Sequence, residues 1–213
     1  MKIPHRELEA FRRDPRAWVI RRQQAPPFQG RRLWNESALR MAVHWLHKGH
    51  TVEEAASKLV FYARKDPDLE GRHAALERLF AYERWHRESG RITTHVHLPL
   101  PPWEPSPVTV GGSVDRIDML PAAAQPVQII FLGRHAGHWR DELRMPLSQY
   151  ALANAFGWPT EEVVVGVQLI DDGEPEIHHY SSADINAALA EFGELRRGVV
   201  EAVPGPEPKA PPP

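Results

Sequence analysis

The stretch Gly111–Met119 contains the residue whose type and position best suit catalysis, Asp115. A glycine turn precedes this aspartate, and an apolar segment over residues 127–133, which follows after about a dozen residues, is typical of a buried strand. Mg²⁺ prefers hard oxygen ligands, and bound Mg²⁺ can generate the hydroxide that cleaves a phosphodiester. Asp115 is therefore a candidate metal ligand of a hydrolytic site.

The second strand of this arrangement lacks the groups that such a site needs. Residues 127–133 contain neither an acid nor a lysine, and no lysine occurs between Lys65 and Lys209. Arginine cannot replace the lysine as a base because its guanidinium stays protonated. The nearby acids Asp118, Asp141 and Glu142 can complete the site only if the fold brings them to Asp115. We therefore expect cleavage to be lost or nearly lost.

Hydrophobic periodicity and turn residues divide the chain into a helical first part and a second part of alternating strands and helices. We expect helices over 6–24 with an interruption near Asp14-Pro15, from Asn35 to Gly49, from a capping box at Thr51 onward, and over 72–89. We expect strands over 92–98, 108–119, 127–133, 162–170 and 174–180, with helices over 140–156 and 182–198. This order predicts an α/β (α+β) fold with a central mixed sheet flanked by helices.

The same pattern predicts one domain with three regions. Residues 1–90 form an N-terminal helical region of the domain, residues 91–200 form its α/β core, and residues 201–213 form a disordered proline-rich tail.

Composition narrows the class of protein. With 213 residues and 42% hydrophobic residues, the chain can bury a sizeable core, and the absence of cysteine excludes disulfides, iron–sulfur clusters and thiolate zinc sites. Neither a signal peptide nor an apolar run of about 18 residues is present, so we expect a cytoplasmic protein without a membrane partner.

Charge is distributed unevenly along the chain. Residues 1–40 hold ten Lys or Arg against four acids, whereas residues 141–213 hold four against thirteen. A basic end of this kind suits an anion such as a nucleic-acid backbone, although two solvated surfaces explain the pattern equally well.

Several phrases of the sequence, in a shared order over about residues 5–200, resemble the RecB-like branch of the PD-(D/E)XK nuclease superfamily. Leu8–Trp18 resembles the family's opening helical phrase, Met41–Leu46 its helical Gly-x-x-x-His phrase, and Gly112–Asp118 its Gly-x-x-Asp-x-x-Asp phrase. The resemblance implies a restriction-endonuclease-like core in which Asp115 and His44 bind Mg²⁺ or Mn²⁺ and form the catalytic site.

The resemblance weakens after these phrases. The family has a strand with an acid and a lysine at this point, whereas residues 129–134 contain neither. Asp14 stands where some members have the cysteine that holds an iron–sulfur cluster. The helix phrase Gln-x-x-x-Tyr, which contacts the substrate strand in the family, has Pro146 in place of the glutamine, so only Tyr150 transfers.

Our first hypothesis is a nuclease-like pseudoenzyme that binds DNA or serves as a subunit of a helicase–nuclease or defence complex. Its DNA contacts would come from Arg12, Arg13, Arg16, Arg116, Arg134 and Tyr150. The alternatives are an active Mg²⁺- or Mn²⁺-dependent exonuclease or endonuclease with a rearranged site, and a protein-interaction module that touches no nucleic acid. An aspartate near a strand end can also merely cap the backbone, and the chain's other histidines suit plain surface or hydrogen-bonding roles.

Overall fold

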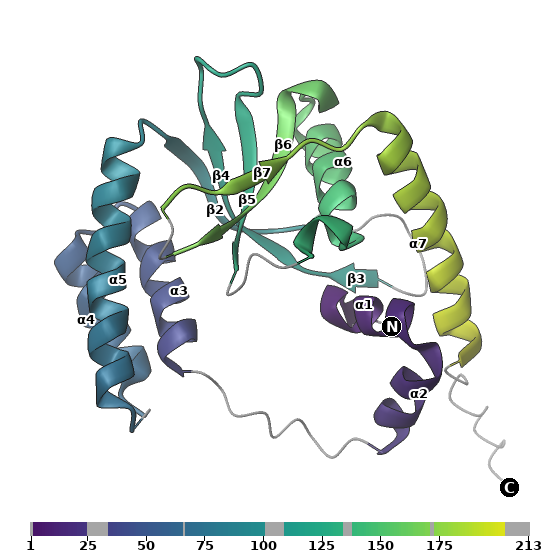
Figure 1. The fold of residues 1–213 in the computed structure, drawn as a ribbon, viewed down its shortest axis with the longest axis horizontal. Coiled ribbons are helices and arrows are strands. Elements are labelled where there is room, and N and C mark those ends of the chain that lie inside the picture. The colour runs from purple at the N-terminus through teal and green to yellow at the C-terminus, as the bar shows by residue number, and fades with distance from the viewer. Residues whose placement is uncertain are drawn as a thin grey trace, which may run out of the picture.

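The computed structural model describes residues 2–24, 34–65, 67–100, 109–133, 138–170 and 173–202. These residues form an α+β structure in which a five-stranded mixed sheet lies between two groups of helices (Figure 1). The predicted class and the mixed central sheet are confirmed.

The central sheet follows the predicted strands closely. Its strands are β2 (Ile92–Pro99), β4 (Ser113–Met119), β5 (Val127–Gly133), β6 (Val163–Leu169) and β7 (Glu176–His178), in the order β2-β4-β5-β6-β7. All neighbouring pairs are antiparallel except β5 and β6, which are parallel and are joined through α6 (Arg144–Phe156). Parallel strands of this kind are covered on both faces, which explains why β5 and β6 are almost uniformly apolar.

One face of the sheet is covered by three helices, which we call the three-helix layer. It consists of α3 (Trp34–His47), α4 (Val52–Ala63) and α5 (Leu69–Glu88), whose apolar sides form one cluster with Leu132 and Ile170 of the sheet region. The capping box predicted at Thr51 is confirmed, with Glu54 as its reciprocal partner. Asn35 does not cap α3 as expected, because the helix already begins at Trp34.

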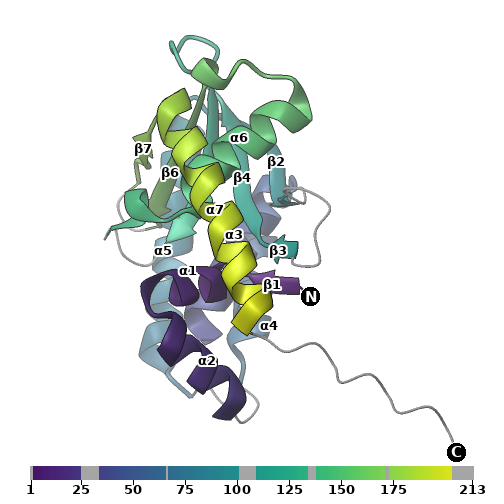
Figure 2. The same cartoon turned by 90° about the vertical axis from the view of Figure 1, so that its right-hand side faces the viewer.

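The opposite face is covered by α6 and by α7 (Ser182–Ala202) (Figures 1 and 2). The main core lies here, where the buried side chains of β4, β5 and β6 meet Met145 and Leu152 of α6 and Ile185 of α7. The helix expected over 140–156 is shorter, because Trp139–Asp141 form a separate 3₁₀ turn before α6. A second 3₁₀ turn, Thr160–Glu162, leads into β6.

The N-terminal segment packs apart from the three-helix layer. It forms β1 (Lys2–Pro4), α1 (His5–Arg13) and α2 (Pro15–Gln24), and its apolar residues Ile3, Phe11 and Trp18 form a cluster with Val199 of α7. Strand β1 pairs in parallel with β3 (Thr109–Gly111), a two-stranded sheet that the sequence did not predict.

Gly112 separates β3 from β4, so the strand expected over 108–119 is two strands. A Cβ at Gly112 would lie 3.2 Å from Nδ1 of His5 and 3.3 Å from Cδ1 of Leu100, a spacing that favours glycine. The disordered tail predicted over 201–213 is wrong for its first two residues, because α7 continues to Ala202. Residues 203–213 and the turn residues Asp171 and Asp172 lie outside the described residues. No helix within the described ranges is long and apolar enough to cross a membrane.

Candidate functional site

The structure brings Asp115 and His44 together in one group, which we call the carboxylate site. Arg40 donates to Asp115 Oδ1 from Nε at 2.5 Å and to Oδ2 from Nη2 at 2.8 Å. His44 Nε2 lies 2.8 Å from Oδ1, and the backbone N–H of Leu132 donates to Oδ2 at 2.7 Å. A carboxylate has about four lone-pair positions, so these four contacts satisfy Asp115 completely.

Electrostatics keep this carboxylate ionised although it is 1% exposed. Burial by itself raises the pKa of Asp115, but the hydrogen bond from His44, the charge and hydrogen bonds of Arg40 and the Leu132 N–H together lower it below its usual value. Because an ionised carboxylate can only accept, the hydrogen between His44 and Asp115 must be on His44 Nε2.

Asp115 also has a structural task at the point where two strands separate. The ladder between β4 and β5 ends at the pair Arg116 and Ile130, and the next available N–H on β5 is that of Leu132. The Asp115 side chain accepts this N–H in place of a strand partner. The alternative that this aspartate caps the backbone is therefore correct in part. Its side chain binds a backbone N–H, and it also contacts His44.

These residues do not fit the Mg²⁺ or Mn²⁺ ion that the resemblance implies. The guanidinium of Arg40 takes the side of the carboxylate where a cation would bind, and its charge offsets that of Asp115. The nitrogen of His44 that faces Asp115 carries a hydrogen and cannot be a ligand in this state. Within the described part of the chain, no three His, Asp or Glu side chains are arranged to hold a metal ion.

The three acids that could have completed the site are engaged elsewhere. Asp118 pairs with Arg116 inside the protein, Glu142 pairs with Arg144, and the Asp141 side chain is 80% exposed beside His138. None of them contacts Asp115 among the interactions found between described residues. These three acids therefore do not join Asp115 in a rearranged metal site.

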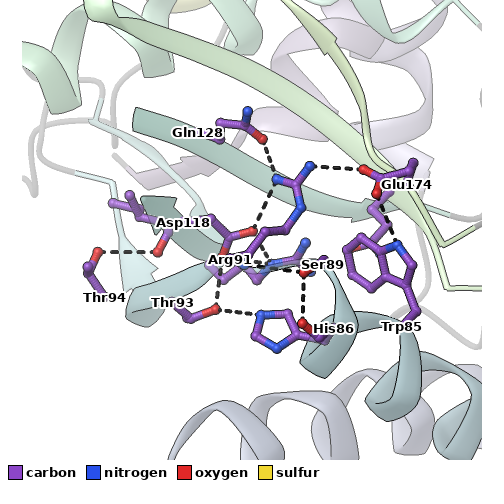
Figure 3. Close-up of polar contacts among 12 residues, drawn as sticks. Trp85, His86, Ser89, Arg91, Thr93, Thr94, Asp118, Gln128 and Glu174 are labelled. Carbon is purple, nitrogen blue, oxygen red and sulfur yellow. Dashed lines mark hydrogen bonds and ion pairs between the residues drawn. The ribbon is translucent and has the colours of Figure 1, made fainter. Parts of the chain in front are cut away.

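Asp118 belongs to a second, closed group, which we call the Asp118 network (Figure 3). Asp118 is fully buried and accepts from Arg116 Nε at 2.8 Å and from the hydroxyl of Thr93 at 2.8 Å. The Arg91 guanidinium lies 3.8 Å from Asp118 and also bonds Gln128 and Glu174, so the network ties α5, β2, β4 and β5 to the segment before β7. Its polar side chains bond one another and neighbouring segments, while Arg91 Nε and Arg116 Nη2 are buried without a partner among the described residues.

Two histidines connect this network to a pocket of about 510 Å³ between the helices of the three-helix layer and β2. His47 Nε2 lies 2.7 Å from Tyr82 Oη, which also accepts from Arg116, and His86 Nε2 lies 3.1 Å from Thr93 Oγ1. Burial, followed by the charge of Arg116, lowers the pKa of His47 to about 2 and also lowers that of His86. Both rings are therefore neutral at pH 7.

The predicted nucleic-acid contacts are distributed over several surfaces. Arg13 and Arg16 are exposed on α1 and α2, while Arg12 is held by Glu191 and by the backbone oxygen of Asp141. Arg116 is 1% exposed and serves the Asp118 network, so it does not present its guanidinium to a ligand.

Tyr150 is 39% exposed on α6, on the face of the sheet opposite the three-helix layer. Arg134 lies outside the described residues.

Sequence reasoning missed a set of basic side chains beside the carboxylate site, which we call the basic edge: Arg40, Lys48 and His97. Arg40 has a 43% exposed side chain, and Lys48 and His97 are exposed. His97 lies opposite Asp115 on β2, and its ring centroid is 5.1 Å from that of His44. Burial, His44, Arg40 and Lys48 lower the pKa of His97, while Asp115 opposes them.

A signal for the basic edge was present in the sequence. Arg40, His44 and Lys48 recur at i, i+4 and i+8, which places them on one side of a helix. The sequence could not reveal that this side of α3 faces Asp115, since that depends on how α3 packs on the sheet.

An apolar groove of about 580 Å³ lies elsewhere, between α2 and the end of α7. Its lining includes Phe11, Val19, Ile20 and Ala202. The third hypothesis, a protein-interaction module, expected such a surface at the nuclease site, but the exposed described residues beside Asp115 are those of the basic edge.

No protein-family model matches this chain, and a search of curated proteins also finds no match.

Proposed function

We propose that this protein is a catalytically inactive protein of the PD-(D/E)XK, RecB-like type that binds DNA. The observation that carries this proposal is the carboxylate site, in which Arg40, His44 and the Leu132 N–H use every acceptor position of Asp115. An arginine thus takes the place that a divalent cation would need in an active enzyme of this type.

The topology supports a restriction-endonuclease-like core. Three antiparallel strands are followed by the crossover helix α6 and a strand parallel to the third. Asp115 lies on the middle strand where it separates from its neighbour, and His44 approaches from the helical first part of the chain, as the resemblance implies. Fold likeness alone does not assign activity, so the proposal depends on the chemistry of the site.

Loss of cleavage follows from the charges. A divalent ion would have to displace Arg40 from a bidentate pair and remove a hydrogen from His44, and no second described carboxylate contacts the site. The basic edge and the exposed arginines Arg13 and Arg16 remain as groups that attract phosphates. Such a protein would bind DNA alone or hold it for an active partner in a DNA-processing complex.

The first experiment tests cleavage and metal binding. Purified protein is incubated with labelled single- and double-stranded DNA in Mg²⁺ or Mn²⁺, next to Asp115→Ala, and Mg²⁺ binding is measured by calorimetry. We expect no cleavage by either protein and no heat of Mg²⁺ binding. Metal-dependent cleavage that disappears in Asp115→Ala would instead establish the active nuclease of the alternative hypothesis.

The second experiment tests DNA binding. Fluorescence anisotropy at several salt concentrations compares the wild type with Arg13→Gln/Arg16→Gln and with the control Lys65→Gln/Arg84→Gln, which removes the same charge from exposed positions beyond α4 and on α5. Affinity should fall steeply with salt, and the first double variant should bind more weakly than the control. A wild type without salt-dependent DNA binding would refute the proposed function.

A further inference from the structure

The basic edge has donors that the protein itself does not use. Arg40 bonds Asp115 through Nε and Nη2 only, and its Nη1 has no hydrogen bond to any described residue. Among the same residues, the side chains of Lys48 and His97 likewise have no ion pair or hydrogen bond. Arg40 and His97 therefore lie beside the carboxylate site with donor positions left over, and Lys48 is near enough for its charge to act on His97.

The charge balance of this region is positive. The Asp115 charge is offset by Arg40 in a bidentate pair, and Lys48 has no acidic partner among the described residues. An oxyanion approaching the exposed side of Arg40 would meet this net charge and would not have to displace an internal ion pair.

The backbone of His97 provides an independent observation. Its φ is 52°, the one positive φ found for a residue other than glycine in the described ranges. This conformation is uncommon for residues other than glycine, although histidine, like asparagine, adopts it more often than most. The strained residue lies in the edge strand β2, opposite Asp115. Strain of this kind concentrates at functional sites, where the position of a side chain matters more than stability.

We infer that Arg40, Lys48 and His97 form an oxyanion site that binds a phosphate of the nucleic-acid backbone without a metal ion. The inference rests on the proposed function and adds the ligand group and the residues that bind it. Arg40 then has two roles: one edge of its guanidinium neutralises Asp115, and its remaining N–H groups face the phosphate.

The test measures DNA affinity in EDTA for the wild type and two variants. Lys48→Gln removes one phosphate contact, so it should lower the salt slope by about 1 and weaken binding about tenfold at 0.1 M salt. His97→Asn removes the imidazole but suits the positive φ, so it should weaken binding while the melting temperature stays level or rises. Arg40 is left unchanged because its loss would also disturb Asp115.

Matched controls separate this inference from general charge effects. Lys65→Gln and His73→Asn change the same residue types at exposed positions beyond α4 and on α5, and both should bind DNA as the wild type does. Wild-type affinity for Lys48→Gln and His97→Asn, with binding lost only in Arg13→Gln/Arg16→Gln, would overturn the inference and leave the proposed function standing. A wild type that binds no DNA would overturn both.

Two further outcomes define the ligand. Binding in EDTA should equal binding in Mg²⁺ at matched ionic strength, and a requirement for Mg²⁺ would overturn the metal-independent site. Inorganic phosphate should shift the NMR signals of the His97 ring only at millimolar concentration, whereas DNA should shift them at its much lower dissociation constant. Equal affinity for both would assign the site to free phosphate and overturn its assignment to a nucleic acid.

Discussion

Strand β4 carries two buried aspartates three residues apart, and each is paired with an arginine, yet their surroundings differ. Asp118 is paired with Arg116, which is 1% exposed, so both members of this pair are buried. Asp115 is paired with Arg40, whose side chain is 43% exposed and is flanked by two further basic groups.

The comparison shows how burial of the cation separates structural ion pairs from sites that can meet a ligand. A fully buried ion pair contributes to the fold by satisfying buried polar groups. An ion pair whose cation faces solvent keeps hydrogen-bond donors that another molecule can use. The Asp118 network accordingly joins five parts of the fold, whereas the carboxylate site joins one helix to two strands. Substitutions at the two sites should therefore differ in size and in kind.

Replacement of Asp118 should have the largest effect. Asp118→Ala leaves Arg116 buried without its carboxylate, which costs about 3–5 kcal/mol of the free energy of unfolding. Urea unfolding followed by circular dichroism measures this loss. Asp141→Ala, at a side chain that is 80% exposed, is the control and should stay within about 0.5 kcal/mol of the wild type. A loss below about 1 kcal/mol for Asp118→Ala would contradict the structural role.

Replacement of Asp115 should cost less, about 2 kcal/mol in the same assay. Arg40 can turn toward water, so the main penalty comes from the unpaired His44 and the Leu132 N–H. If Asp115→Ala were as destabilising as Asp118→Ala, the distinction between an open and an enclosed pair would not hold.

Acid should destabilise the protein through His47. The folded-state pKa of His47 is lowered from 6.5 to about 2, so its contribution is complete above pH 6.5 and is lost as the pH falls and the unfolded state takes up a proton. Between pH 7.5 and pH 5 this loss amounts to about 2 kcal/mol. Unfolding measured at both pH values should show a smaller loss for His47→Gln and an unchanged loss for His73→Gln, whose side chain is 76% exposed. Equal pH dependence in all three proteins would argue against a neutral, buried His47.

The smallest effect is expected from neighbouring threonines on β2. Thr93→Val removes a donor to Asp118 and an acceptor for His86, which should cost about 1–2 kcal/mol. Thr94→Val removes one exposed hydroxyl, which is bonded at 3.2 Å to the backbone oxygen of Ile117 and at 3.1 Å to Nδ1 of His95, and should cost less than about 0.5 kcal/mol. Thermal unfolding of the two variants side by side tests the difference, and a reversed order would contradict the network.

Much of the fold was predictable because local signals agreed with the tertiary structure. The capping box at Thr51 fixed the start of α4, and the strands predicted over 127–133 and 162–170 were confirmed as β5 and β6, the second one residue shorter at each end. The prediction failed where distant contacts decide, as at Gly112, whose break allows β3 to pair with the N-terminal strand β1. Strand pairing over a hundred residues has no local pattern.

The candidate site was predictable in part. The contact between His44 and Asp115 is confirmed, and the resemblance alone had placed these residues together. Arg116 shows the opposite case, because an arginine in a polar run of a strand looks accessible in sequence but is enclosed by Tyr82 and Asp118 here. Arg40 was overlooked as a partner of Asp115 because 75 residues separate them and only the fold brings them together.

Residue type and local periodicity were enough to give the order of the main helices and of the central-sheet strands, the absence of thiol chemistry and the lack of an acid and a lysine after Asp115. The tertiary structure alone decided which cation meets each carboxylate and how much of it faces water. Those two properties depend on the packing of α3 and α5 against the sheet, where side chains distant in the chain compete for the same buried space.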